Sequence, residues 1–175
     1  MATLSEHRQH RRWWERKWWE RALGRLASTP VGGWFYVHVA PSIDRRLVRS
    51  SQGRINTTGG GLWPVTLLTA TGAKSGQPRT TPLLYFNDDG DVVVIASNGG
   101  RPFNPAWYHN LRANPEATLF INGRTMICTA REAAGSERER LWAKAVALFR
   151  GYEVYQRRTL GRQIPVIILT PKSQR

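Results

Sequence analysis

The chain has 175 residues and carries 26 Lys and Arg side chains against 12 Asp and Glu, for a formal net charge of +14. This length is typical of one domain with or without an appendage, and the positive charge favours anionic partners such as nucleic acid, anionic lipid or a phosphorylated small molecule. Cys128 is the one cysteine, which excludes an intrachain disulfide, and we expect it to be a buried strand residue in a reducing, cytoplasmic setting. The sequence shows neither an apolar run of about 18 residues nor a secretory signal, so we expect no membrane-spanning helix.

Residues 6–27 predict a basic amphipathic helix rich in tryptophan. One half of its helical wheel collects the apolar side chains Trp14, Trp18, Trp19, Ala22, Leu23 and Leu26. Indole rings among basic side chains are typical of the headgroup region of an anionic membrane, here the inner face of the cell membrane. The same face also suits packing on the domain or a partner subunit, or contact with nucleic acid. We expect residues 1–29 to form this appendage and residues 30–175 to form the main domain.

A second helix is predicted from Pro41 to about Gly53, and the Gly-rich stretch at 56–61 reads as a linker or as a lid over a site. After this stretch the pattern changes to strands. Three runs rich in branched residues predict strands at 65–70, 80–86 and 92–97. Asn87–Gly90 has the composition of a hairpin turn between the last two of these strands.

Residues 104–113 predict a short helix, and Asn122-Gly123 predicts a tight hairpin between two further strands. The apolar run at 164–170 predicts a last strand. Five or six strands, mostly joined by hairpins and separated at intervals by helices, favour an α+β fold built on a closed or half-open antiparallel barrel.

Between the last two strands, Ser136 and Glu139 have the spacing of a capping box. This spacing predicts a helix that begins at Ser136 and ends near Phe149. Its buried face would carry Leu141, Ala145 and Leu148.

The first candidate binding turn is TGAKSGQPR. Gly72 and Gly76 allow backbone conformations that other residues avoid, and they let a ligand approach the main chain. Lys74 and Arg79 add fixed positive charge, and an arginine can bind phosphate with two nitrogens. The spacing is not that of a Walker loop. The turn is therefore either an anion site or an ordinary hairpin turn with solvated charges.

The second candidate turn runs from Ser97 to Arg101 and leads into a predicted helix. Pro105 suits the first turn of that helix, whose free amides favour negative charge. Trp107 and Tyr108 are either a flat wall for a ring system or plain core residues. Two such turns in succession, followed by an aromatic helix, favour an anionic ligand that carries a ring.

Three segments in order, TGAKSGQPRTTPL, ASNGGRP and NPAWYHNLRANP, are similar to the deazaflavin-dependent nitroreductase family. These actinobacterial proteins use coenzyme F420, and the match covers roughly Ile43 to Pro171. The resemblance implies a split antiparallel β-barrel like those of the flavin-nucleotide oxidases. It also implies hydride transfer from reduced F420 to a hydrophobic acceptor, which is a quinone, a nitroaromatic compound or an activated alkene. The membrane-associated N-terminus of the family's nitroreductase suits residues 6–27.

Carried over residue by residue, the resemblance assigns the anionic tail of F420 to Lys74 and Arg79. The full set of cofactor-binding residues that it implies is Lys74, Ser75, Arg79, Thr81, Ala96, Ser97, Asn98, Gly99, Gly100, Pro105, Ala106, Trp107, Tyr108 and Asn110. Phe149, Tyr152 and Tyr155 correspond to the wall of the substrate site. Ser97 and Tyr152 are the candidate catalytic residues, because a hydroxyl can stabilise or protonate the reduced acceptor.

Two positions depart from the family pattern. Many members have lysine where this chain has Asn98, so one anion contact is lost unless Arg101 replaces it. Phe149 stands where the family has a further tyrosine, which removes a hydroxyl from the substrate wall. His109 is expected to face solvent or to cap a turn, and neither the histidines nor the single cysteine have the spacing of a metal site.

Other functions fit parts of the same sequence. The barrel also suits FMN or haem, and a protein of this kind can carry a deazaflavin without turnover. Charge and tryptophan content also fit a nucleic-acid binder, but no recognition helix, aromatic RNA-binding motif or zinc knuckle is present, so no nucleic-acid partner is expected. Barrels of this type often pair, which makes a homodimer an open expectation.

Overall fold

The computed structural model describes residues 64–172. The two helices and the Gly-rich stretch predicted before Pro64 lie outside the described residues, as does the proposed boundary between 1–29 and 30–175. The strands are β1 (Val65–Thr71), β2 (Pro78–Asp88), β3 (Asp91–Ile95), β4 (Glu116–Ile121), β5 (Arg124–Glu132) and β6 (Val166–Pro171). The helices are α4 (Ala106–Ala113), α5 (Gly135–Leu148) and α6 (Gly151–Arg158), with the short 3₁₀ turn η2 (Asn98–Gly100) before α4.

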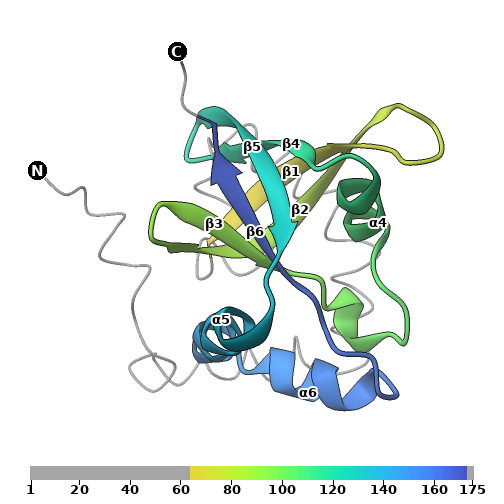
Figure 1. Cartoon of the computed structure of the whole chain (residues 1–175), viewed down its shortest axis with the longest axis vertical. Helices are drawn as coiled ribbons and strands as arrows, with labels where there is room; N and C mark the ends of the chain where they lie inside the picture. The colour runs from red at the N-terminus through yellow and green to blue at the C-terminus, as the bar shows by residue number, and fades with distance from the viewer. Residues whose placement is uncertain (1–63, 173–175) are drawn as a thin grey trace, which may run out of the picture.

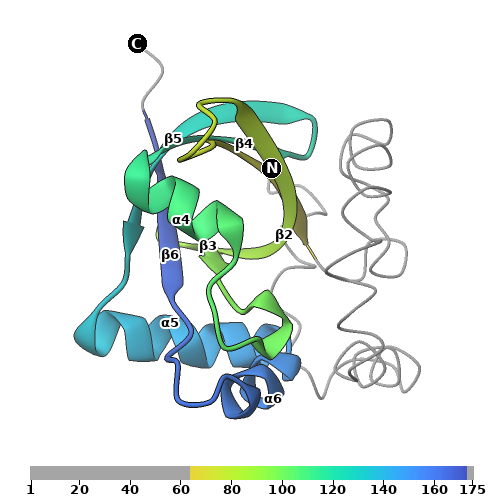
Figure 2. The ribbon, with the colours of Figure 1, turned by 90° about the vertical axis from the view of Figure 1, so that its right-hand side faces the viewer.

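The six strands form a closed barrel in the order β1-β2-β3-β6-β5-β4, and β4 pairs with β1 to close it. Every pair of neighbouring strands is antiparallel. Figure 2 shows the strands as a ring, with α4 beside it and with α5 and α6 together at one end. The antiparallel barrel predicted from the sequence is confirmed.

Two hairpins form at the turns that the sequence marks for them. Asp89-Gly90 joins β2 to β3 and Asn122-Gly123 joins β4 to β5, and all four residues have positive φ values between 48° and 88°. Two successive left-handed residues make the turn that best matches the twist of paired strands, and Asn, Asp and Gly adopt that conformation most readily. These turns fix the register of the β2–β3 and β4–β5 pairs, because a slip by one residue would turn the apolar side chains outward.

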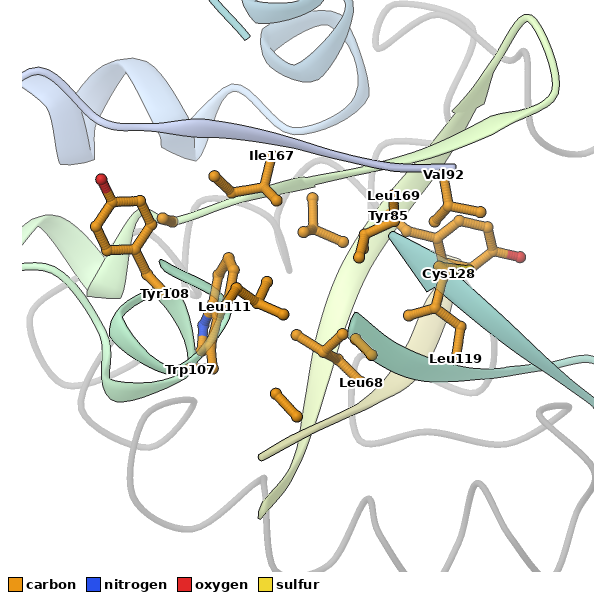
Figure 3. Packing of buried hydrophobic residues seen from close by; sticks show 14 residues of the cluster. Leu68, Tyr85, Val92, Trp107, Tyr108, Leu111, Leu119, Cys128, Ile167 and Leu169 are labelled. Atoms are coloured by element: carbon orange, nitrogen blue, oxygen red, sulfur yellow. The ribbon is translucent and has the colours of Figure 1, made fainter. Parts of the chain in front are cut away.

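The barrel is filled by side chains that alternate along each strand. Leu68, Leu119 and Leu169 are fully buried in this interior, together with Cys128. Figure 3 shows these side chains converging from strands that lie apart in the sequence, with Trp107 and Leu111 of α4 reaching the same cluster. Burial raises the pKa of the Cys128 thiol to about 11, so it stays protonated, and the prediction of a buried strand cysteine is confirmed.

A second apolar cluster lies outside the barrel, where α5 and α6 cover β3 and β6 (Figure 1). Both faces of these two strands are buried, which explains why their sequences are continuous apolar runs rather than alternating ones. The buried face of α5 carries Leu141, Ala145 and Leu148, as predicted. Within the described residues no helix is long and apolar enough to cross a membrane.

The capping box predicted for α5 is wrong. The helix begins at Gly135 with Ala134 at its N-cap, and no side chain caps it. Ser136 therefore lies inside the first turn, where its hydroxyl cannot serve as the capping acceptor. The end of the helix at Leu148 agrees with the prediction of an end near Phe149.

Candidate functional site

A cavity of about 970 Å³ lies between the β1–β2 turn and α4. Its walls come from the turn, from the start of β2, from the loop before α4 and from α4 itself. The predicted cofactor-binding residues that line it are Lys74, Ser75, Arg79, Thr81, Ala106, Trp107 and Asn110. The first candidate turn and the aromatic helix, about 30 residues apart in the sequence, are therefore two sides of one site.

The β1–β2 turn owes its shape to its glycines. The amide of Gly72 donates to the Gln77 carbonyl at 2.9 Å, and the amide of Gly76 donates to the Gly72 carbonyl at 2.8 Å. Gly76 has a φ of +65°, and a side chain on Gly72 would place its Cβ 2.7 Å from Ser75 Oγ. This tight turn leaves Lys74 exposed where the chain reverses. The cationic side chain therefore projects at the edge of the cavity without a competing ion pair among the described residues.

Helix α4 is joined to this turn by a hydrogen bond. The amide of Ala73 donates to Asn110 Oδ1 at 3.0 Å, across 37 residues of sequence. Trp107 lines the cavity while only 6% of its surface is exposed, so its indole is held by the barrel cluster. The result is a fixed apolar wall opposite a cationic turn, as the sequence motifs predict.

Tyr108 does not line the cavity, although it neighbours Trp107. Its hydroxyl donates to Glu132 of β5 at 2.8 Å and accepts from Arg112 at 3.1 Å. Burial raises the pKa of this tyrosine above its ordinary value, so the hydroxyl remains a donor. Figure 3 shows the hydroxyl turned away from Leu68 in the barrel interior. Tyr108 fastens α4 to the barrel, and a direct contact between Tyr108 and a ligand stays a prediction.

The second candidate turn lies against α6 rather than in the cavity. A Cβ on Gly100, whose φ is +82°, would lie 2.9 Å from the Tyr155 carbonyl oxygen. Asn98 has a φ of +51° and its side chain donates to the Phe103 carbonyl at 3.0 Å, which holds the loop closed. The turn residues predicted to bind cofactor, Ala96, Ser97, Asn98, Gly99 and Gly100, do not line the cavity, and neither does Pro105 at the N-cap of α4.

The predicted substrate wall is buried beside this turn. Phe149, Tyr152 and Tyr155 pack together, with ring centroids 5.3 Å apart between Phe149 and Tyr152 and 6.4 Å apart between the two tyrosines. All three belong to the outer apolar cluster and none lines the cavity. Burial raises the pKa of Tyr152 above the ordinary range of a phenol, so its hydroxyl stays protonated.

Sequence reasoning missed Arg162, which organises the loop between β3 and α4. Its guanidinium donates to the carbonyls of Ala96, Ser97 and Arg101 and to Asn104 Oδ1. These partners lie 58 to 66 residues away in the sequence, so no local pattern indicates the contacts.

On the side of α4 and the loop before it, three lining residues were not assigned to ligand binding. Phe103, which is 58% exposed, Asn104 and His109 all line the cavity. The exposure expected for His109 is confirmed. Among residues 64–172, no group of three or more His, Cys, Asp or Glu side chains is placed to hold a metal ion.

A sequence model of the F420H(2)-dependent quinone reductase family matches residues 42–171. The chain belongs to this family. An F420H(2)-dependent quinone reductase of Mycobacterium tuberculosis strain H37Rv is 37% identical to it over 146 residues, which are 80% of this chain and 97% of the relative. The deazaflavin-dependent family and the cofactor class predicted from the three motifs are therefore confirmed.

Solved structures agree with this family membership. The F420-H2 dependent reductase FDR-A superposes with a TM-score of 0.56 at 42% identity, covering 61% of this chain and 93% of that one. A second structure, described as a domain-swapped dimer, superposes with a TM-score of 0.57 at 37% identity and covers 73% of this chain and 97% of that one.

The cavity has the chemistry that F420 requires. Lys74 and Arg79 on one wall offer positive charge to an anionic tail, and the Trp107 indole on the other wall offers a flat apolar surface to a ring system. The volume of the cavity is also that of a cofactor site rather than of a single ion site. The residues present therefore fit this cofactor, with Asn98 in place of the lysine that many family members carry.

Proposed function

We propose that this quinone reductase family member binds F420 in the cavity between the β1–β2 turn and α4, and that it reduces a quinone. The observation that carries the proposal is that one cavity joins the cations Lys74 and Arg79 to the fixed indole of Trp107. The activity named for the M. tuberculosis relative supports the choice of acceptor. Nitroaromatic compounds and activated alkenes are the alternative acceptors of a hydride from reduced F420.

In this proposal the two cations hold the charged tail of the cofactor. Hydrogen bonds to charged groups contribute about 1.5–3 kcal/mol each, which is enough to make either residue important for affinity. The hydrogen bond from Ala73 to Asn110 keeps the turn at a fixed distance from α4, so the cations and the indole act as one surface. A site that is already formed binds without the cost of ordering its loops.

The reaction needs alignment and one proton donor. When bound, reduced F420 supplies a hydride, and a quinone that takes up this hydride and one proton becomes a hydroquinone. Trp107 excludes water from one side of the cavity and orients a ring placed against it. Orientation by the protein, rather than a covalent step, is the main contribution we assign to these residues.

Tyr152 is the residue we propose for the proton, on the resemblance to the family. It packs in the outer apolar cluster and does not line the cavity, so we place the acceptor against that cluster, beside the cavity. The residue is only 5% exposed, and burial keeps its hydroxyl protonated. No side-chain hydrogen bond of this hydroxyl is recorded among the described residues. Buried phenol groups normally have a partner, so an acceptor oxygen of the substrate is a natural one. Ser97, half-buried beside η2, is the second candidate for the same role.

Stopped-flow oxidation of reduced F420 by menadione tests this function. The wild-type protein is expected to reoxidise the cofactor with saturable kinetics, and Tyr152→Phe is expected to lower kcat about 10²-fold or more with little change in cofactor affinity. The contrary result would be a protein that binds reduced F420 while none of three acceptors (menadione, a nitroaromatic compound and an activated alkene) oxidises the bound cofactor. Such a protein would be a carrier and not a reductase.

We propose a position on the cytoplasmic face of the membrane, with residues 6–27 in contact with anionic lipid. The clustering of tryptophan and basic residues in that segment supports the proposal, as does the apolar nature of a quinone. Flotation with vesicles of phosphatidylglycerol and phosphatidylcholine is the test. The full chain should float with these vesicles and not with pure phosphatidylcholine. Equal flotation of a chain lacking residues 1–27 would contradict the assignment.

We also propose that the protein forms a homodimer. The support is the relative solved as a domain-swapped dimer, which is 37% identical and almost completely covered by the alignment. Sedimentation equilibrium of the full chain should give twice the 19.9 kDa of one copy. A single species of monomer mass at high micromolar concentration would rule the dimer out.

A further inference from the structure

The Arg162 side chain makes five hydrogen bonds to other described residues. Nε and Nη2 donate to the Arg101 carbonyl at 3.2 and 2.9 Å, Nη2 also donates to the Ser97 carbonyl at 3.0 Å, and Nη1 donates to the Ala96 carbonyl at 3.3 Å. The fifth bond runs from Nη1 to Asn104 Oδ1 at 2.6 Å. A guanidinium has five N–H groups, so this set of bonds uses its full capacity on one loop.

None of the four atoms that accept these five bonds is charged, and no ion pair among the described residues includes Arg162. Burial accordingly lowers the pKa of the guanidinium from its ordinary value, although arginine stays protonated. A half-buried cation paired only with neutral groups loses part of its hydration without gaining an ion pair, so its main contribution is the geometry that it imposes on the loop. That geometry is the path of the chain from β3 to the cavity wall at Asn104.

Asn104 is the point where this loop reaches the cavity. Its side chain lines the cavity, and its oxygen is already occupied by Arg162. A side-chain amide carries its oxygen and its nitrogen on opposite branches, so the bond to Arg162 also decides where the nitrogen lies. No described residue accepts a hydrogen bond from Asn104 Nδ2. The amide nitrogen is therefore a donor without a partner among the described residues, and it belongs to a residue that lines the cavity.

We propose that Asn104 is a ligand-binding residue that donates from Nδ2 to an oxygen of bound F420, and that Arg162 is the positioning residue that holds it in that orientation. This inference rests on the proposed binding of F420 in the cavity. It adds an uncharged, directional contact to the cationic contacts of the β1–β2 turn. Such a contact recognises a carbonyl or phosphate oxygen and rejects a ligand that offers a donor at the same place.

The substitution Asn104→Asp separates this role from a structural one. An aspartate keeps the oxygen that Arg162 binds and adds an ion pair, so the unfolding temperature of the cofactor-free protein should stay the same or rise. The donor is lost and a negative charge faces the cavity. The affinity for oxidised F420, followed by the fluorescence of the cofactor, should therefore fall about tenfold or more. Asn122→Asp in the exposed β4–β5 turn makes the same change of charge away from the cavity, and it should leave the affinity unchanged.

A double-mutant cycle tests the part played by Arg162. Arg162→Lys keeps the charge but loses the planar set of five donors. It should weaken F420 binding about tenfold when Asn104 is present and add little when Asn104 is already alanine. All affinities are measured well below the unfolding temperature of each variant. If Arg162→Lys weakens binding equally in both backgrounds, or only lowers the unfolding temperature, the positioning role is refuted.

The outcomes separate this inference from the function on which it rests. Failure of the wild-type protein to bind F420 would overturn the proposed function and the inference with it. If the wild-type protein and Asn104→Asp bind F420 equally well, the assignment of Asn104 is wrong while the function stands. Weaker binding by Asn104→Asp at unchanged stability, with Asn122→Asp unaffected, supports the inference.

Discussion

The backbone amide of Ala73 donates a hydrogen bond of 3.0 Å to the side-chain oxygen of Asn110. This contact joins the cationic turn between β1 and β2 to the helix that carries Trp107, and Figure 1 shows the turn projecting from the barrel beside α4. One bond of this kind contributes only about 0.5–1.5 kcal/mol to stability. Its larger effect is to fix the distance between the two walls of the cavity.

Removing the acceptor of this bond is expected to weaken cofactor binding more than it weakens the fold. Asn110→Leu leaves the Ala73 amide without its partner and lets the turn move, so the dissociation constant of F420 should rise by roughly three- to tenfold. Asn110→Gln keeps an uncharged amide oxygen as a possible acceptor and serves as the matched variant. Isothermal titration should show the larger loss for leucine, and equal losses for both variants would show that the hydrogen bond is not what matters.

The two cations of the turn should account for most of the salt dependence of binding. Lys74→Gln or Arg79→Gln is expected to weaken F420 binding by about 1–3 kcal/mol at low ionic strength, because each removes a charged hydrogen bond to an anion. The loss should shrink as salt is added. Arg124→Gln at the exposed start of β5 removes the same charge at a distance from the cavity. A comparable loss in that control would mean that only net charge is being measured.

Substitution of Gly100 is expected to lower the free energy of unfolding, because this residue packs against the backbone of α6. An alanine there would place its Cβ 2.9 Å from the Tyr155 carbonyl oxygen and 3.0 Å from the Tyr155 Cα, at a φ of +82°. Gly90→Ala has the same kind of left-handed conformation, with a φ of +88°, but its Cβ would meet nothing within 4 Å. Gly90→Ala should cost about 1–2 kcal/mol of unfolding free energy from the backbone alone, and Gly100→Ala clearly more. Urea unfolding that gives equal losses would contradict the contact between η2 and α6.

Acid should weaken the attachment of α5 to the barrel through Asp88. Both terminal nitrogens of Arg140 donate to this buried carboxylate, at 2.8 and 2.7 Å, and Lys144 also binds it. The Arg140 hydrogen bonds, and then Lys144, lower the pKa of Asp88 to about 2, against the opposing effect of burial. The folded pKa lies below the unfolded value of about 3.9, so the stabilisation is complete above that value and is lost as the pH falls towards 2.

We expect Asp88→Asn to lose roughly 1–2 kcal/mol of unfolding free energy at pH 7, a modest value because both cations are about half exposed and are screened by solvent. The variant should also lose the steep part of the pH dependence between about pH 4 and pH 2. Urea unfolding at a series of pH values measures both effects. Asp89→Asn, at the next position but exposed, should follow the wild-type curve, and a matching loss there would assign the effect to general charge.

The fold could be predicted from the sequence because its signals are local. Asn122-Gly123 and Asp89-Gly90 place two of the hairpins, and runs rich in branched residues mark the strands. The local capping signal did not predict the correct first residue of α5. Ser136 has the right neighbours for a cap, but the chain that enters α5 from β5 starts the helix at Gly135.

The site could be predicted only in part. The Gly and Lys pattern of the first turn and the aromatic pair of α4 are visible in the sequence, and the motifs identify the family. The direction in which each side chain points is not visible. Trp107 and Tyr108 are neighbours, yet one lines the cavity and the other binds Glu132. Arg162 reaches its partners only through the closed barrel, so its role depends on the whole fold.

The most direct test is a fluorescence titration of the purified protein with oxidised F420 and, in parallel, with FMN. The cationic turn and the indole of Trp107 predict saturable binding of F420 that is weakened by Lys74→Gln, and weaker binding of FMN, because FMN carries less negative charge for the turn to hold. Tight binding of FMN, with no binding of F420 even at high concentration, would contradict the account.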